Sequence, residues 1–163
     1  MSAAGTSPFS LRSSAFVHGA PIPSRHTCDG ADRSPPLAWS GVPPATKSFV
    51  LICDDPDAPG KTWVHWVLYE LPGNLTQLAE GVPKTETLDD PAGALQGVND
   101  SRRVGYGGPC PPPGGPHRYF FKLYALDAAL GLGARATKAQ VEQAMRGHVV
   151  AEAPLMGTYE RRR

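Results

Sequence analysis

The sequence predicts a mainly β fold, an antiparallel β-sandwich with a helix near the C-terminus. Glycine and proline each account for 18 of the 163 residues, a content typical of short strands joined by many turns. Three runs are rich in β-branched and aromatic residues and end at turn residues, and only one segment repeats its apolar residues at helical spacing. We place a single domain at residues 9–163 and expect the small, polar residues 1–8 to be disordered.

The first two expected strands flank a turn rich in aspartate. Residues Ser48–Cys53 form an almost continuous apolar run, which predicts a strand buried on both faces. The acidic turn Asp54–Pro59 ends this strand. The second strand covers Trp63–Leu71, where strict alternation places His65 on one face with Val67.

The third expected strand covers His117–Leu126. Alternation there points His117 and Tyr119 to one side and Arg118 to the other. Between the second and third strands, residues 81–108 are rich in turn residues and weakly apolar, which indicates a long surface excursion whose internal structure the pattern does not determine.

One helix is expected after the third strand. Thr137 and Gln140 match the capping box, and the apolar residues from Val141 onward fall at helical spacing. Pro154 bounds this pattern, and Gly157–Tyr159 predicts a final extended segment.

The charge balance and the cysteines limit the class of protein. Sixteen basic and fifteen acidic residues give a net charge of +1, so no overall field attracts nucleic acid or an anionic membrane. No apolar run approaches the roughly 18 residues of a membrane span, and residues 1–20 lack the apolar core of a secretory signal. Cys28, Cys53 and Cys110 have no zinc-binding spacing, so we interpret them as reduced thiols. These features predict a cytoplasmic protein with no nucleic-acid partner and no integral membrane association.

The acidic turn brings three carboxylates close together in the sequence. Asp54, Asp55 and Asp57 would repel one another in one dry site, so at least one must be solvated, hydrogen-bonded to backbone or paired with a cation. Arg118 is the expected partner of Asp57 or Asp54. Taken alone, the acidic turn is better explained as an Asx-type turn that closes a strand, and only a partner elsewhere in the chain would favour a functional role.

Two histidines are candidates for a binding site. A lone histidine in an apolar strand is usually a core residue, but His65 and His117 both lie in strands attached to proline-rich turns. If the strands converge, Asp55 can fix the tautomer of one imidazole and leave the opposite N–H directed into a cavity. The same three residues could ligate a metal, although they lack the helical spacing of metalloprotease histidines.

The segment Gly105–Gly115 has a high density of glycine and proline. Free backbone N–H groups in such turns form anion-binding concavities, although a rigid connector would have the same composition. The segment matches neither the dinucleotide fingerprint nor the P-loop. Cys110 has no histidine beside it in the sequence, which argues against a nucleophilic role.

Several motifs occur in a fixed order over Phe9 to Tyr159: Thr27-Cys28-Asp29-Gly30, Ser34-Pro35-Pro36-Leu37-Ala38-Trp39, Asp55-Pro56-Asp57-Ala58-Pro59, Trp63-Val64-His65-Trp66, and Gly105 to Pro112 continuing to His117-Arg118-Tyr119. Together they resemble the phosphatidylethanolamine-binding protein family, also called the Raf kinase inhibitor family, and its shorter bacterial and archaeal branch in particular. The resemblance implies a large antiparallel sheet packed on a smaller one. It also implies a small pocket at one end that accepts phosphate, phosphorylated head groups or similar anions.

By motif position, the resemblance places six residues around this pocket: Asp55, Pro59, His65, Pro112, His117 and Tyr119. The longer eukaryotic members continue into a terminal helix that borders the pocket, whereas the printed sequence ends soon after Gly157–Tyr159. We therefore expect a more open site, or one completed by a second subunit in a homodimer, as in the bacterial branch.

The expected function is that of a soluble, non-enzymatic binding protein for a small phosphate-like or carboxylate-like anion, with no cofactor. The imidazoles would donate hydrogen bonds, the aspartate would orient an imidazole, the tyrosine would contribute its hydroxyl or its ring, and the prolines would shape the rim. Two alternatives remain open. One is an interaction protein that inhibits a kinase or a protease, and the other is a metal-assisted hydrolase using His65, His117 and Asp55.

Overall fold

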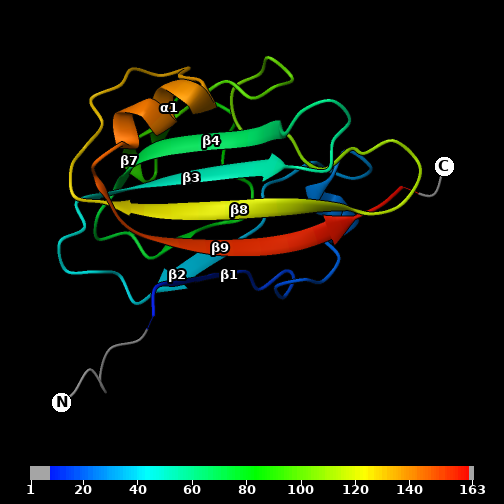
Figure 1. Ribbon diagram of the computed structural model, residues 1–163, viewed down its shortest axis with the longest axis horizontal. Coiled ribbons are helices and arrows are strands. Elements are labelled where there is room, and N and C mark those ends of the chain that lie inside the picture. Colours follow the sequence, from blue (N-terminus) through cyan, green and yellow to red (C-terminus); the bar gives the residue numbers. More distant parts are fainter. Residues whose placement is uncertain (1–7, 162–163) are drawn as a thin grey trace.

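The computed structural model describes residues 8–161 and shows two antiparallel β-sheets packed face to face (Figure 1). A six-stranded sheet has the order β6-β7-β4-β3-β8-β9, and a three-stranded sheet has the order β1-β2-β5. The predicted class, a mainly β antiparallel sandwich with one helix near the C-terminus, is confirmed. The disorder expected for residues 1–7 lies outside the described residues.

The strands of the large sheet are β3 (Ser48–Asp55), β4 (Trp63–Pro72), β6 (Thr87–Asp89), β7 (Ala92–Gln96), β8 (His117–Leu126) and β9 (Val149–Tyr159). The small sheet consists of β1 (Ser10–Arg12), β2 (Leu37–Ser40) and β5 (Gln77–Leu78). The helical elements are a short 3₁₀ turn, η2 (Ser24–His26), and the helix α1 (Lys138–Met145). Among residues 8–161, no helix is long and apolar enough to cross a bilayer.

The three long predicted strands and the helix agree closely with these bounds, whereas the final strand, β9, begins at Val149, well before the predicted segment Gly157–Tyr159. All eight residues of β3 are buried, as its continuous apolarity predicts. The capping box at the start of α1 is present, with reciprocal hydrogen bonds between Thr137 and Gln140. Pro154 lies within β9 rather than between elements. This position is compatible with a strand because β9 is at the edge of its sheet, where a missing N–H is tolerated.

The two faces of the large sheet cover two separate cores. The larger core lies between the sheets and contains Phe49, Trp66 and Phe121 together with Trp39 of the small sheet. The smaller core lies under α1, where Val141 packs with residues of β3 and β4. The continuous apolarity of β3 follows from this arrangement, because its side chains enter both cores in alternation.

Strand β4 does not alternate regularly at its first residues. Cys53 of β3 pairs with Trp66, but the next residue, Asp54, pairs with Val64, so His65 is an extra residue on β4. Such a β-bulge redirects the side chains on the bulged strand.

The bulge changes the face to which His65 belongs. Val64 and Val67 both belong to the core under α1, although alternation would put them on opposite faces. His65 instead lies against Tyr119 of the core between the sheets, with 5.3 Å between the ring centroids. The prediction that His65 shares a face with Val67 is therefore wrong, because the alternation is interrupted between Val64 and Trp66.

The cysteines also differ from expectation. Cys28 and Cys110 form a disulfide across 82 residues of sequence, and Cys53 is a buried free thiol. The interpretation of all three as reduced thiols is wrong, because the fold brings together two loops that are distant in the sequence. A cytoplasmic location stays a prediction, and it loses the support that reduced thiols would give it.

A count of thiols tests this pairing. In the unfolded protein without reductant we expect one reactive thiol, that of Cys53, and after reduction we expect three. In the folded protein Cys53 should react slowly, because burial raises the pKa of its thiol. Three thiols in the unreduced, unfolded protein would contradict the disulfide.

Removing the disulfide should lower the stability of the fold. For a loop of this size we expect the double substitution Cys28→Ser and Cys110→Ser to lower the free energy of unfolding by about 3–5 kcal/mol. Urea denaturation of the variant, compared with reduced and oxidised wild type, measures the change. The reduced wild type should resemble the variant, and equal midpoints for all three samples would contradict the expectation.

Candidate functional site

A cavity of about 1090 Å³ opens at one end of the sandwich, where β3 ends and β4 and β8 begin. All six residues predicted to line a pocket do line this cavity: Asp55, Pro59, His65, Pro112, His117 and Tyr119. His65 and Tyr119 are buried, whereas Pro59 and Pro112 are exposed at the rim. That these residues bind a ligand stays a prediction.

The three carboxylates of the acidic turn have separate partners. Asp54 is buried on the helix side, where it accepts from Lys138 Nζ at 2.9 Å. Asp57 binds the guanidinium of Arg118 through two bonds of 2.9 Å each, as the sequence predicts, and this contact lowers the pKa of Asp57 to about 2. Only Asp55 is turned toward the cavity. The repulsion that three adjacent carboxylates would cause is thereby relieved.

Asp55 holds the ring of His117. The distance between His117 Nδ1 and Asp55 Oδ2 is 2.7 Å, and the other carboxylate oxygen accepts from the backbone N–H of Asp57 at 2.7 Å. Nδ1 therefore donates to the carboxylate, and Nε2 is the ring nitrogen available to the cavity.

His65 is held in the same way by a backbone carbonyl. Its Nδ1 lies 2.7 Å from the carbonyl oxygen of Gly107, so Nδ1 donates and Nε2 again remains available. Burial lowers the pKa of His65, which favours the neutral ring. The expectation of an N–H directed into the cavity needs correction, because with Nδ1–H engaged, Nε2 carries a proton only when the imidazole is positively charged.

Tyr119 lies between the two imidazoles and supplies a neutral donor. Its ring centroid is 5.3 Å from that of His65 and 6.4 Å from that of His117. Within residues 8–161 its hydroxyl is buried and has no hydrogen-bond partner, a rare condition that calls for an explanation. Burial raises the pKa of Tyr119, so the hydroxyl keeps its proton and can donate to a ligand.

The glycine- and proline-rich segment forms one wall of the cavity and is held on two sides. The backbone N–H of Gly107 donates to the His65 carbonyl at 2.9 Å, and that of Gly108 donates to Asp32 Oδ1 at 2.8 Å. These two N–H groups are thus used within the protein rather than left for an anion. Between Pro109 and Pro113 only Cys110 has a backbone N–H, and within residues 8–161 it donates to no protein acceptor.

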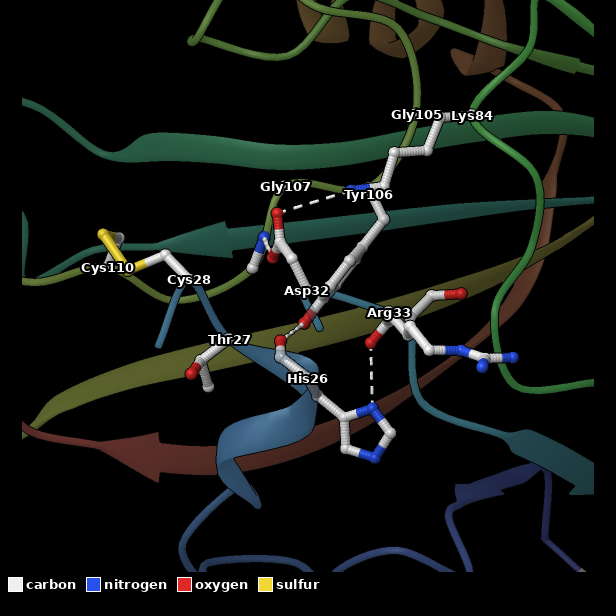
Figure 2. A network of polar contacts seen from close by, with 12 residues as sticks. His26, Thr27, Cys28, Asp32, Arg33, Lys84, Gly105, Tyr106, Gly107 and Cys110 are labelled. Carbon is white, nitrogen blue, oxygen red and sulfur yellow. Dashed lines mark hydrogen bonds and ion pairs between the residues drawn. A yellow bond between two sulfur atoms is a disulfide. The ribbon is translucent and has the colours of Figure 1, made fainter. Parts of the chain in front are cut away.

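A second loop, which contains His26 and Cys28, is bound to this glycine- and proline-rich segment (Figure 2). The Tyr106 hydroxyl donates to the His26 carbonyl at 2.6 Å, and the Cys28 N–H donates to the Pro109 carbonyl at 3.1 Å. The Cys28–Cys110 disulfide joins the same two segments at the edge of the cavity. Sequence reasoning missed this role, although both cysteines lie in motifs that it had singled out.

Sequence reasoning also missed the far wall of the cavity. Residues from the unassigned segment 81–108 and from the loop before α1 line it: Lys84, Thr85, Glu86, Arg102, Arg103 and Arg135. The adjacent arginines Arg102 and Arg103 after Asn99-Asp100 were the available signal, because Asn and Asp favour turns that expose their neighbours.

The predicted alternative of a metal site is not supported by the arrangement of side chains. Within residues 8–161, no group of three or more His, Cys, Asp or Glu side chains could hold a metal ion. Asp55 is engaged with His117 Nδ1 and therefore orients the imidazole.

Comparison with known proteins identifies the family of the chain. The family model described as phosphatidylethanolamine-binding protein matches residues 12–160. A UPF0098 protein of Methanothermobacter thermautotrophicus is 55% identical over 151 residues, covering 93% of this chain and 98% of its own length. A UPF0098 protein of Aquifex aeolicus is 49% identical over 160 residues, covering 97% and 92%.

Two crystal structures are also similar. One, of a homologue of phosphatidylethanolamine-binding protein from Chlamydia trachomatis, has a TM-score of 0.85 and 43% identity, covering 94% of this chain and 98% of its own. The other, of Escherichia coli YbcL, has a TM-score of 0.88 and 35% identity, covering 95% and 99%. The chain therefore belongs to the phosphatidylethanolamine-binding protein family, in its prokaryotic UPF0098/YbcL branch.

Proposed function

We propose that the protein binds a small phosphate-like or carboxylate-like anion in this cavity, without a catalytic step. One observation carries the proposal: the ring of Tyr119 lies beside two imidazoles that each have one nitrogen bound and the other available, and its buried hydroxyl has no hydrogen-bond partner among residues 8–161. A buried hydroxyl without a partner is costly, and an oxyanion that accepts from it would remove that cost. Membership of a family with a phosphate-like ligand pocket supports the same proposal.

Binding should be linked to a proton. Nδ1 of His65 and of His117 already donates within the protein, so Nε2 can donate to an anion only from the charged imidazolium. A fully ionised oxyanion therefore has to be accompanied by proton uptake at a ring, whereas a protonated oxyanion can donate its own hydrogen to a neutral Nε2. Either route makes the site bind more tightly in acid.

Asp55 gives the ring of His117 a carboxylate partner. Its carboxylate is 3% exposed and bound to the ring, so a positive charge on His117 would form a buried, hydrogen-bonded ion pair. His65 has only a neutral carbonyl as its partner, and burial opposes its charge. We therefore assign the neutral role to His65 and the direct contact with the anion to His117, whose ring is held by Asp55.

The proton linkage can be measured with sulfate, whose own charge does not change in the relevant range of pH. We expect sulfate to bind at least about 10-fold more tightly at about pH 5.5 than at about pH 8, because only the imidazolium supplies a charged donor. Calorimetry in buffers of different ionisation enthalpy should show proton uptake on binding. Equal affinity at the two pH values, or tighter binding at the higher one, would refute the assignment.

A matched pair of histidine variants controls this experiment. His148 also binds an aspartate through Nδ1, at 2.8 Å from Asp127 Oδ1, but it is exposed and does not line the cavity. We expect His117→Gln to lower sulfate affinity about 10-fold or more at low pH and to flatten the pH dependence. His148→Gln should leave both unchanged.

Tyr119 offers a test in which stability and binding change in opposite directions. Tyr119→Phe removes a buried hydroxyl without a partner, so the free energy of unfolding of the free protein should rise by about 1 kcal/mol. The same change should weaken phosphate binding by about 5- to 10-fold, because the ligand loses a donor. Urea denaturation and calorimetry measure the two effects.

Tyr69→Phe is the matched control. The Tyr69 hydroxyl donates to the Gly133 carbonyl and accepts from the Ala136 N–H, away from the cavity. Its loss should destabilise the fold by about 1 kcal/mol and leave phosphate affinity unchanged. Destabilisation by Tyr119→Phe with unaltered binding would contradict the role given to that hydroxyl.

A further inference from the structure

The cavity is larger than a single oxyanion requires. Its volume of about 1090 Å³ is similar to that of sites that enclose molecules of drug size, roughly 300–1,000 Å³. Besides the two imidazoles, its lining includes Val104, Arg102 and Arg103. The space beside the proposed anion site is therefore available to the rest of a longer molecule.

The far wall has unneutralised positive charge. Lys84 faces Asp32 at 3.3 Å, as Figure 2 shows, and Arg135 faces Glu86 at 3.5 Å, so each of these cations has a nearby carboxylate. Among residues 8–161, Arg102 and Arg103 take part in no ion pair. Two adjacent arginines thus line the cavity without a paired carboxylate among the described residues, an arrangement suited to a carboxylate or a phosphate.

The turn that presents these arginines is built by a buried side chain. Asn99 is 5% exposed, and its Oδ1 accepts from the backbone N–H of Ser101 at 2.9 Å and of Arg103 at 3.2 Å. Its Nδ2 donates to the Gly105 carbonyl at 3.0 Å. Every polar atom of the Asn99 side chain is thus used to fix the backbone around Arg102.

The same turn is fixed to the sheet beside the histidine. The backbone N–H of Asp100 donates to the Val64 carbonyl at 2.9 Å, and Asp100 Oδ2 accepts from the Val64 N–H at 2.8 Å. Val64 immediately precedes the bulge residue His65. The position of the two arginines relative to the imidazole is therefore set by a short, hydrogen-bonded path.

Arg102 occupies a backbone conformation that suits glycine better. Its φ is +65°, in the left-handed region, which is strained for a residue with a Cβ. Strained residues of this kind are concentrated at ligand sites, where the surrounding structure holds them in place. Here the strain places a guanidinium at the wall of the cavity, where glycine would leave none.

We propose that the ligand is an elongated small molecule with two acidic groups, one bound at the imidazoles and the other at Arg102 and Arg103. This inference rests on the proposed function for the first group and adds the second. Each group alone would bind weakly, but a molecule that reaches both sites gains from the effective concentration of its second group. Its ends are phosphates, phosphonates or carboxylates, joined by a spacer that lies in the cavity.

A series of alkane α,ω-bisphosphonates tests the proposal, with alkyl monophosphonates of the same chain lengths as reference ligands. For wild type we expect one range of spacer lengths in which the bisphosphonate binds at least about 10-fold more tightly than its monophosphonate. Shorter spacers should lose this advantage because they cannot span the two sites. Calorimetry at fixed pH and ionic strength gives the affinities.

The test variant combines Arg102→Gly with Arg103→Gln. Glycine adopts a left-handed φ without strain, so the change at position 102 should not lower the free energy of unfolding. We expect the bisphosphonate advantage to fall to about 3-fold or less, with monophosphonate affinity changed by less than about 3-fold. Arg146→Gln is the control for a lost charge, because Arg146 is exposed and does not line the cavity.

The outcomes separate this inference from the proposed function. Monophosphonates that bind wild type with no bisphosphonate advantage at any spacer length would overturn the second site and leave the first intact. An advantage that persists in the Arg102→Gly, Arg103→Gln variant would overturn the assignment to these arginines. Absence of binding by every ligand of the series would overturn the proposed function and this inference with it.

Discussion

The candidate site depends on one extra residue in strand β4. Regular alternation would have turned His65 toward the core under α1, together with Val67. The bulge opposite Cys53 and Asp54 places it instead against Tyr119, on the side from which His117 also approaches. Two imidazoles from non-adjacent strands thereby meet one hydroxyl, and the Gly107 carbonyl can reach His65 Nδ1. The position of His65 beside Tyr119 and its contact with the Gly107 loop both depend on this local change of register.

The surrounding charges are arranged so that the imidazoles remain available. Asp54 and Asp57 are bound by Lys138 and Arg118, outside the cavity, and only Asp55 reaches into it. That one carboxylate is engaged with His117, so it orients the ring and does not face an incoming anion alone. The disulfide and the hydrogen bonds around it hold the opposite wall in place. An anion would therefore meet a preformed site and would not have to order it.

The sequence predicted what depends on local pattern and missed what depends on pairing between distant segments. The long strands, the capping box at Thr137 and the direction of Arg118 follow from composition and alternation, and the structure agrees with them. The bulge at His65 depends on which residue of β3 lies opposite, and no signal in β4 alone reveals it. The disulfide spans 82 residues, so spacing could not identify it. Strands β6 and β7 are short, and the pairing of β7 with β4 includes buried Gln96, a residue that hydropathy patterns classify as surface.

The site is maintained at a cost to the stability of the free protein. The hydroxyl of Tyr119 is buried without a hydrogen-bond partner in the described part of the chain, and Arg102 is held in the left-handed region. Burial lowers the pKa of His65, so the neutral ring stabilises the fold above its ordinary pKa of about 6.5, and this contribution is lost as the pH falls through the lowered value. A bound anion acts in the opposite direction, because it favours the imidazolium. Since linkage is reciprocal, the anion and the proton must each strengthen the binding of the other, and acid that weakens the empty site also increases its affinity for the ligand.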